Sequence, residues 1–229
     1  MIISTAVLID AGLGLVAGII YSLKGVYDRA GKTHEDVSEK IKEQVHLSET
    51  DEKYIKETQE LLVEIFGENA CERFRNATKF ERIEMMHNFA EKLSELYGLD
   101  ITVDISINQP TNDGIQLGCF SQENNKAEFN IFLLTLDLSD FREPEYFDEI
   151  FYMALDTVIH ELRHAVQHRA ITEEGFWDVD EERRNQWANN MAGNNYIRPE
   201  VDMIGYQLQP IEADAVVFAE NCLKGVRPE

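Results

Sequence analysis

The chain has 229 residues, of which 44% are hydrophobic and 10% aromatic, so it can bury a sizeable core and is not a disordered polypeptide. Its 21 Lys and Arg residues stand against 43 Asp and Glu, and the formal net charge of −22 repels phosphates and anionic membrane surfaces. We therefore exclude nucleic acid as a direct partner. The acidity mildly favours cationic partners or peptides, and most of the carboxylates are expected to lie on solvated helix faces. Cys71, Cys119 and Cys222 are far apart and form no CxxC, which predicts neither a disulfide framework nor a cysteine zinc site and indicates a reducing compartment.

The N-terminal segment, residues 2–23, contains a single charge, Asp10, and is long enough to cross a bilayer as a helix. Gly14 and Gly18 form a GxxxG spacing that suits close helix packing in lipid. The apolar residues also recur at steps of four and three, which is the stripe of an amphipathic helix docked on protein. For residues 1–30 we keep two interpretations: a membrane anchor, or a buried or self-associating docking helix. The basic residues that follow favour a cytoplasmic body, tethered in the first case to the inner face of a membrane.

Residues 31–98 are predicted to form a helical region. The first part, residues 31–50, is charged and weakly periodic and indicates a linker or an exposed helix. Apolar residues then recur at helical spacing over residues 61–97, and Gly98 is a plausible helix stop. His87 lies within this pattern and is interpreted as a surface or hydrogen-bonded histidine, not as a metal ligand.

The hydrophobic period changes after this region. Residues 100–107 (DITVDISI) alternate between apolar and polar, which predicts a half-buried strand. The Pro, Asn and Gly of residues 108–114 predict a turn. IQLGCF at 115–120 and AEFNIFLLTLDL at 127–138 are predicted as two more strands, joined as a hairpin through the polar residues 121–126.

A long apolar helix is expected next, over residues 146–170, following Pro144. The order of helices, a small sheet and then a buried helix is typical of an α+β arrangement. We therefore assign residues 99–229 to one α+β domain in which the small sheet packs on this helix.

The sequence HELRH lies on this helix. His160 and His164 are four residues apart, so both imidazoles can face one point and bind zinc. Glu161 is one helical step around, and in sites of this pattern the glutamate lies beside the metal-bound water and accepts its proton as zinc lowers the pKa of that water toward about 7. His168 lies on the same stripe but about 12 Å along the axis from His160, and is interpreted as a surface or second-shell residue. Arg163 is expected to face away and pair with acids.

A third ligand must come from elsewhere in the chain. The pattern HExxHxxGxxH fails, because Gln167 and Ala170 occupy the glycine and final histidine positions. A carboxylate from a second helix is the other known solution. QPIEADAVVFAENCL at 209–223 is predicted to be that helix, with Glu212 and Asp214 near its start.

The pairing of HELRH with the downstream pattern E-x-D-A-x-x-F-A resembles the ImmA/IrrE-like group of gluzincin metallopeptidases, whose third zinc ligand is the first glutamate of that segment. The resemblance implies a zincin-like fold in which His160, His164 and Glu212 bind Zn²⁺ and Glu161 is the general base. Asp214 is the rival ligand, and we favour it as a second-shell acceptor that orients a ligating histidine.

The resemblance covers roughly residues 100–223, and the first hundred residues show none. Glu212 lies 48 residues past His164, a longer gap than is usual in these small enzymes. Trp177 and Trp187 in this gap either line a cleft or anchor the loop. As donor to the oxyanion that develops on a carbonyl, we favour Tyr206 over Tyr196, because Tyr206 is closer to the ligand helix.

These features predict an enzyme: a zinc-dependent metallopeptidase that hydrolyses peptide bonds of a protein or peptide substrate through zinc-activated water, with Glu161 as general base. The alternative is a non-catalytic, zinc-containing regulatory or protein-binding module that uses its acidic surface and N-terminal helix to hold a partner. An open fourth coordination position favours the enzyme, and a closed shell of four protein ligands favours the structural role.

Overall fold

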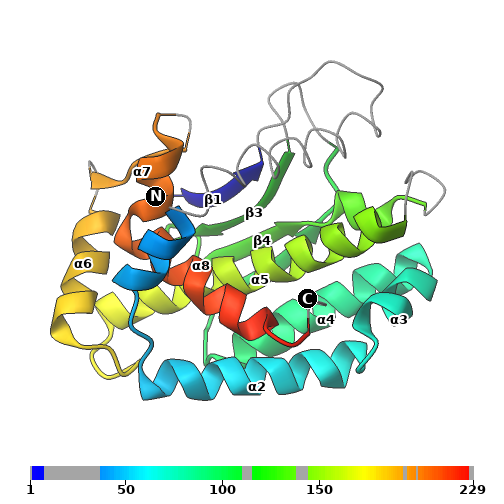
Figure 1. Cartoon of the computed structure of the whole chain (residues 1–229), viewed down its shortest axis with the longest axis horizontal. Coiled ribbons are helices and arrows are strands. Elements are labelled where there is room, and N and C mark those ends of the chain that lie inside the picture. The colour runs from blue at the N-terminus through cyan, green and yellow to red at the C-terminus, as the bar shows by residue number, and fades with distance from the viewer. Residues whose placement is uncertain are drawn as a thin grey trace.

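A computed structural model of the chain describes residues 2–7, 37–109, 115–137, 144–192, 195–199 and 201–226, and for residues 2–7, 144 and 145 it describes the backbone only. Figure 1 shows a small sheet on one side of a long central helix and further helices around it. The α+β class expected from the sequence is confirmed.

The described part of residues 31–98 is helical, as expected. Residues 37–44 are helical and are followed by α2 (Glu49–Phe66), α3 (Ala70–Asn76) and α4 (Lys79–Leu96). Capping boxes begin α2 and α4, at Ser48 and Thr78, because each hydroxyl accepts a hydrogen bond from the third residue of its helix. Gly98 follows α4 with a φ of 66°, a left-handed conformation that ends a helix at little cost in glycine.

Four strands form one sheet in the order β1-β3-β4-β2, namely β1 (Ile2–Val7), β2 (Thr102–Ser106), β3 (Ile115–Ser121) and β4 (Lys126–Asn130). The expected hairpin is confirmed, since β3 and β4 pair antiparallel, while β2 pairs parallel with β4.

The last predicted strand is shorter than expected. Residues 127–138 were predicted to be extended, but β4 ends at Asn130 and Phe132–Thr135 form a 3₁₀ turn, η1. The Asn130 side chain accepts a hydrogen bond from the backbone N–H of Phe132, and the Thr135 hydroxyl donates to the carbonyl of Phe132. These local bonds compete with the strand ladder and end it.

Strand β1 corrects the interpretation of the N-terminus. The helix predicted to begin at Ile2 is wrong for residues 2–7, which pair antiparallel with β3. IISTAV is rich in β-branched residues, which favour strands, and the edge of β3 offers backbone groups that need partners. The rest of the predicted hydrophobic helix, residues 8–23 with its GxxxG, lies outside the described residues. Among the helices that the structure describes, none combines the length and the apolarity needed to span a membrane.

Helix α5 (Pro144–Thr172) is the centre of the fold. The sheet packs on it, and α4 and α8 (Pro210–Leu223) contact it from other sides (Figure 1). One hydrophobic cluster joins residues of α2, α3 and α4 to residues of the sheet, α5 and α8, so the ranges 31–98 and 99–229 share a core.

Two short helices, α6 (Glu181–Met191) and α7 (Met203–Leu208), connect α5 to α8. A second apolar cluster joins Val37 and Ile41 to Ala213 and Val217 of α8. The segment interpreted as a linker or exposed helix therefore buries apolar side chains. Helix α8 is held between this cluster and α5, which fixes the position of its first turn.

Candidate metal centre

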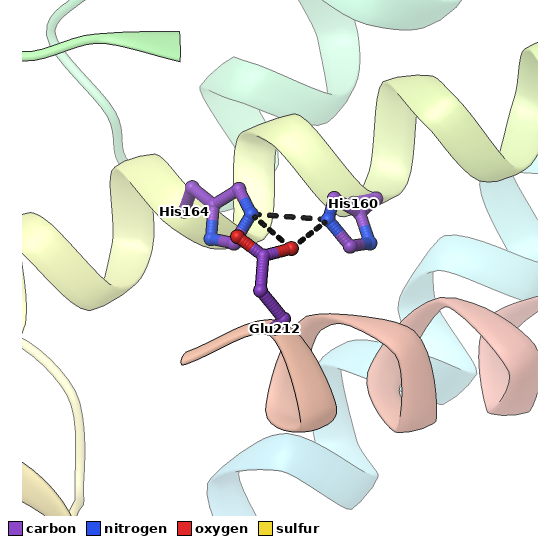
Figure 2. A group of neighbouring side chains, drawn as sticks. All are labelled: His160, His164 and Glu212. Atoms are coloured by element: carbon purple, nitrogen blue, oxygen red, sulfur yellow. Dashed lines mark hydrogen bonds and ion pairs between the residues drawn. The ribbon is translucent and has the colours of Figure 1, made fainter. Parts of the chain in front are cut away.

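Helix α5 places His160 and His164 one turn apart on the same face (Figure 2). The two side chains are almost fully buried, at 6% and 0% exposure, and their Nε2 atoms lie 3.0 Å apart. The apolar residues around them on α5 pack into the core and fix the rotation of the helix: Val158, Ile159, Leu162 and Val166.

Glu212 reaches the two histidines from the first turn of α8 (Figure 2). Its Oε2 lies 3.2 Å from Nε2 of His160 and 3.4 Å from Nε2 of His164. Pro210 begins the helix, where its fixed φ is favourable and its missing N–H costs nothing. The structure thus brings together the three residues that the resemblance implied as ligands, and we call them the donor cluster.

The donor cluster fits a zinc ion. Ligand atoms at about 2.0–2.2 Å from a tetrahedral zinc lie about 3.3 Å from one another. The three distances within the cluster are 3.0, 3.2 and 3.4 Å, and the atoms are imidazole nitrogen and carboxylate oxygen, which zinc prefers. Within the described part of the chain, the cluster contains these three potential ligands and no fourth His, Cys, Asp or Glu.

The charges in the cluster favour a cation. Burial raises the pKa of Glu212, but the charge of His164 and hydrogen bonds from both histidines hold that pKa well below its usual range. Burial lowers the pKa of His160, but the hydrogen bond and charge of Glu212 outweigh it and raise the pKa to about 9. The carboxylate is therefore negative at neutral pH and stabilises positive charge between the rings. A divalent ion competes with a proton for this position.

Gln167 determines which nitrogen of His164 faces the cluster. The Gln167 amide nitrogen donates to the carbonyl of Ile211 at 2.9 Å and to Asp214 at 2.7 Å, and both partners can only accept. The amide oxygen must therefore face His164, whose Nδ1 lies 2.8 Å away. Nδ1 carries a proton, because an amide oxygen cannot donate, so Nε2 is the nitrogen of His164 that could bind a cation at the point shared with Glu212 and His160.

Asp214 has different partners from those expected. It was favoured as an acceptor for a ligating histidine, but it accepts from Gln167, Arg163 and Arg183. Gln167 stands between Asp214 and His164. Asp214 therefore contacts His164 only through the side chain of Gln167.

Asp214 belongs to a closed ionic cluster with Asp51, Arg163 and Arg183. Arg163 pairs with Asp214 and Asp51 at 2.8 Å each, and Arg183 contacts Asp51 at 2.7 Å and also Asp214. Two positive and two negative side chains balance, and the cluster ties together α2, α5, α6 and α8. Burial raises the pKa of each aspartate, but the charges of Arg163 and Arg183 lower both pKa values below the usual range.

The ionic cluster includes or contacts three residues that the sequence analysis singled out: Arg163, Trp177 and Trp187. Arg163 does pair with acids, as expected, but in the core and not on the surface. Trp177 and Trp187 are buried with their rings 5.4 Å from the Arg163 guanidinium, and Trp177 donates to Asp51. Both tryptophans therefore anchor the insertion, and Trp187 also lines a pocket beside Asp180 and Pro210.

The other two histidines singled out from the sequence lie away from the donor cluster. His168 packs its ring 6.0 Å from that of Phe120, and burial lowers its pKa. His87 is partly exposed and pairs with Glu91. Neither belongs to the donor cluster.

Glu161 is fully buried between α5 and the sheet. Gly118 of β3 lies against it, since a Cβ atom at Gly118 would be 3.0 Å from Cγ of Glu161 and 2.6 Å from Cγ2 of Thr157. A side chain at Gly118 would displace the glutamate, so glycine allows β3 to approach the carboxylate. The negative charge of Glu161 also acts on His160.

Two tyrosine hydroxyls approach the far side of Glu212. Tyr196 donates to Oε1 of Glu212 at 2.9 Å, and the ring of Tyr206 lies 6.3 Å from that of Tyr196. Burial and the charge of Glu212 raise the pKa of both phenols. Both therefore keep their protons at neutral pH. The sequence favoured Tyr206, and the structure brings Tyr196 to the cluster as well.

Gln209 holds Tyr196 in place. Its amide donates to the carbonyl of Ile197 at 3.0 Å and accepts from the N–H of Ile197 at 3.1 Å and from Asn190 at 2.9 Å. These bonds attach the residue after Tyr196 to the start of α8, three residues before Glu212.

Sequence reasoning missed the roles of Gln167 and Gln209. Gln167 was considered only as a mismatch to the glycine of HExxHxxGxxH. Its spacing of three from His164 was a usable signal, because residues three apart on a helix are neighbours. Gln209 gave no such signal, since its partners depend on how the insertion folds.

Comparisons of this chain with protein-family models, with curated proteins and with solved structures find no match.

Proposed function

We propose that this protein is a zinc-dependent metallopeptidase with a zincin-like domain, similar to the ImmA/IrrE-like gluzincins, acting on a protein or peptide. The observation that carries the proposal is the donor cluster: two histidines and one glutamate converge at zinc spacing with three protein ligands and no fourth among the described residues. Three protein ligands are typical of catalytic zinc, whereas structural zinc sites usually have four.

A bound zinc would polarise the substrate carbonyl and lower the pKa of water toward about 7. Glu161 then accepts the proton of the attacking water and delivers it to the leaving amine. Its carboxylate suits this role because it is buried on the helix that carries both histidines and its charge acts on His160.

Tyr196 and Tyr206 would donate hydrogen bonds to the oxygen on which negative charge develops. Their raised pKa values keep both hydroxyls protonated, which a donor requires. Tyr196 donates to Glu212 at 2.9 Å, so its hydroxyl lies beside the donor cluster, where this role requires it.

The test is Glu161→Gln in the full-length protein. We expect one zinc per chain in both proteins by elemental analysis, and a loss of peptide cleavage of about 10²–10⁴-fold in the variant. Cleavage is followed as new N-termini in a cell lysate. Glu174→Gln is the matched control, because Glu174 is exposed in the turn after α5. If the wild type binds zinc and cleaves no peptide, the non-catalytic regulatory function replaces the enzyme.

A further inference from the structure

Strand β1 occupies the edge of β3 that lies beside Glu161. Ile2–Val7 lies beside β3 (Figure 1) and pairs with it antiparallel. Thr5 is opposite Gly118 and Ser4 is opposite Cys119. In the strand order β1-β3-β4-β2, β1 is the terminal strand. Removal of β1 would therefore expose the backbone donors and acceptors of β3.

The part of β3 that β1 covers includes Gly118, the residue that lies against Glu161, the candidate general base. A side chain at position 118 would clash with Glu161, and Thr5 is the residue of β1 that pairs with Gly118. Neighbouring strands are separated by about 4.8 Å, so the backbone of β1 is one strand spacing from the backbone that touches Glu161.

An extended peptide can add to such an edge through main-chain hydrogen bonds, with little dependence on its sequence. IISTAV has no charged residue and so avoids repulsion by a chain of net charge −22. It therefore has the conformation, position and charge of an extended peptide bound beside Glu161.

We infer that the edge of β3 is a binding site for extended, uncharged peptide segments and that residues 2–7 fill it as an intramolecular competitor. The inference rests on the proposed function for the role of Glu161. Peptides bind only to molecules in which β1 has left β3, so their apparent affinity is reduced by the fraction of such molecules. The rival explanation is that β1 is a permanent edge strand and peptides bind elsewhere.

A disulfide can lock β1 in place in the full-length protein. Directly opposite residues in an antiparallel pair have Cα atoms about 4.5–5.5 Å apart, within the range that a disulfide spans. Ser4→Cys therefore allows a bond to Cys119, formed with diamide and broken with dithiothreitol. The control is Ser4→Cys combined with Cys119→Ser, which cannot form this bond.

The opposite variant weakens β1. Ser4→Pro with Thr5→Pro removes two adjacent N–H groups, and since alternate groups of a strand face its neighbour, one of them belongs to the ladder. Ser4→Ala with Thr5→Ala is the control that keeps both N–H groups. All proteins also carry Glu161→Gln, so that a bound peptide is not cleaved and binding is measured without turnover.

The probe is a fluorescein-labelled IISTAV peptide, with IIPPAV as its negative control, and binding is measured by fluorescence anisotropy. We expect the double-proline variant to bind about tenfold more tightly than its double-alanine control. We expect the oxidised Ser4→Cys protein not to bind, with binding restored by reduction, and the Cys119→Ser control to be insensitive to oxidation.

Three results would overturn the inference: no disulfide between positions 4 and 119, equal binding to the oxidised and reduced proteins, or no binding to any variant. These outcomes are separable from failure of the proposed function. A wild type that cleaves nothing contradicts the peptidase, while the anisotropy measurements still decide whether β1 competes for the edge of β3.

Discussion

The donor cluster and the ionic cluster are neighbouring groups of buried charged residues, and they differ in how their charges are arranged. The ionic cluster closes on itself, with two arginines and two aspartates in mutual contact. The donor cluster directs two imidazole nitrogens and a carboxylate oxygen at one point. Gln167 joins the two, through His164 on one side and Asp214 on the other. A self-neutralised cluster stabilises a fold, whereas converging lone pairs suit an added cation.

Substitution of Glu212 should have the largest effect on zinc binding by the donor cluster. We expect the zinc affinity of Glu212→Ala to fall by more than the roughly 100-fold that loss of an orienting partner costs, because the variant lacks a proposed ligand and the negative charge between the histidines. Isothermal titration with zinc measures the effect. Exposed Glu220→Ala, in the same helix, is the control. Retained zinc affinity in Glu212→Ala would mean that the ion is held elsewhere.

Disruption of the ionic cluster should reduce stability. In Asp51→Asn, the charges of Arg163 and Arg183 are neutralised only in part, by Asp214. We therefore expect the free energy of unfolding in urea to fall by about 3–5 kcal/mol. Lys53→Ala is the control on the same helix, because the exposed Lys53–Glu57 pair is separated by 3.8 Å and should contribute at most about 0.5 kcal/mol. Equal stabilities of the two variants would contradict a structural role for the ionic cluster.

A substitution of Gln167 tests the connection between the clusters. In Gln167→Leu, His164 loses the acceptor of its Nδ1 proton, and we expect zinc affinity to fall by about 10–100-fold. The variant also removes the hydrogen bonds from the Gln167 amide to the Ile211 carbonyl and to Asp214, which costs about 1–3 kcal/mol of stability. Zinc titration and urea unfolding of the same preparation separate the two effects. Unchanged affinity would show that Gln167 serves the fold alone.

Acid should weaken the ionic cluster gradually. The folded pKa values of Asp51 and Asp214 lie below their usual 3.8, so the unfolded state binds more protons in acid and the stabilisation present above pH 3.8 is lost below it. We expect the free energy of unfolding to decrease between about pH 5 and pH 3, and the difference between wild type and Asp51→Asn to shrink over the same range. A difference independent of pH would contradict this assignment.

Much of the fold could be predicted from local patterns. The alternation of residues 100–107 and the apolar spacing of residues 146–170 indicated β2 and α5, because burial on one face imposes the period of the element. The helix prediction for residues 2–23 is wrong for residues 2–7, because an apolar run rich in β-branched residues can also form a strand and its pairing with β3 is a tertiary contact.

The sequence by itself determined that His160 and His164 share one helix face and that Glu212 begins a second apolar helix, since both follow from spacing along the chain. Only the tertiary structure decided that Glu212 reaches the histidines, that Gln167 orients His164, and that Asp51 meets Arg183 across 132 residues. Such contacts depend on how α2, α5, α6 and α8 pack, and hydrophobic periodicity specifies which face of a helix is buried but not which partner covers it.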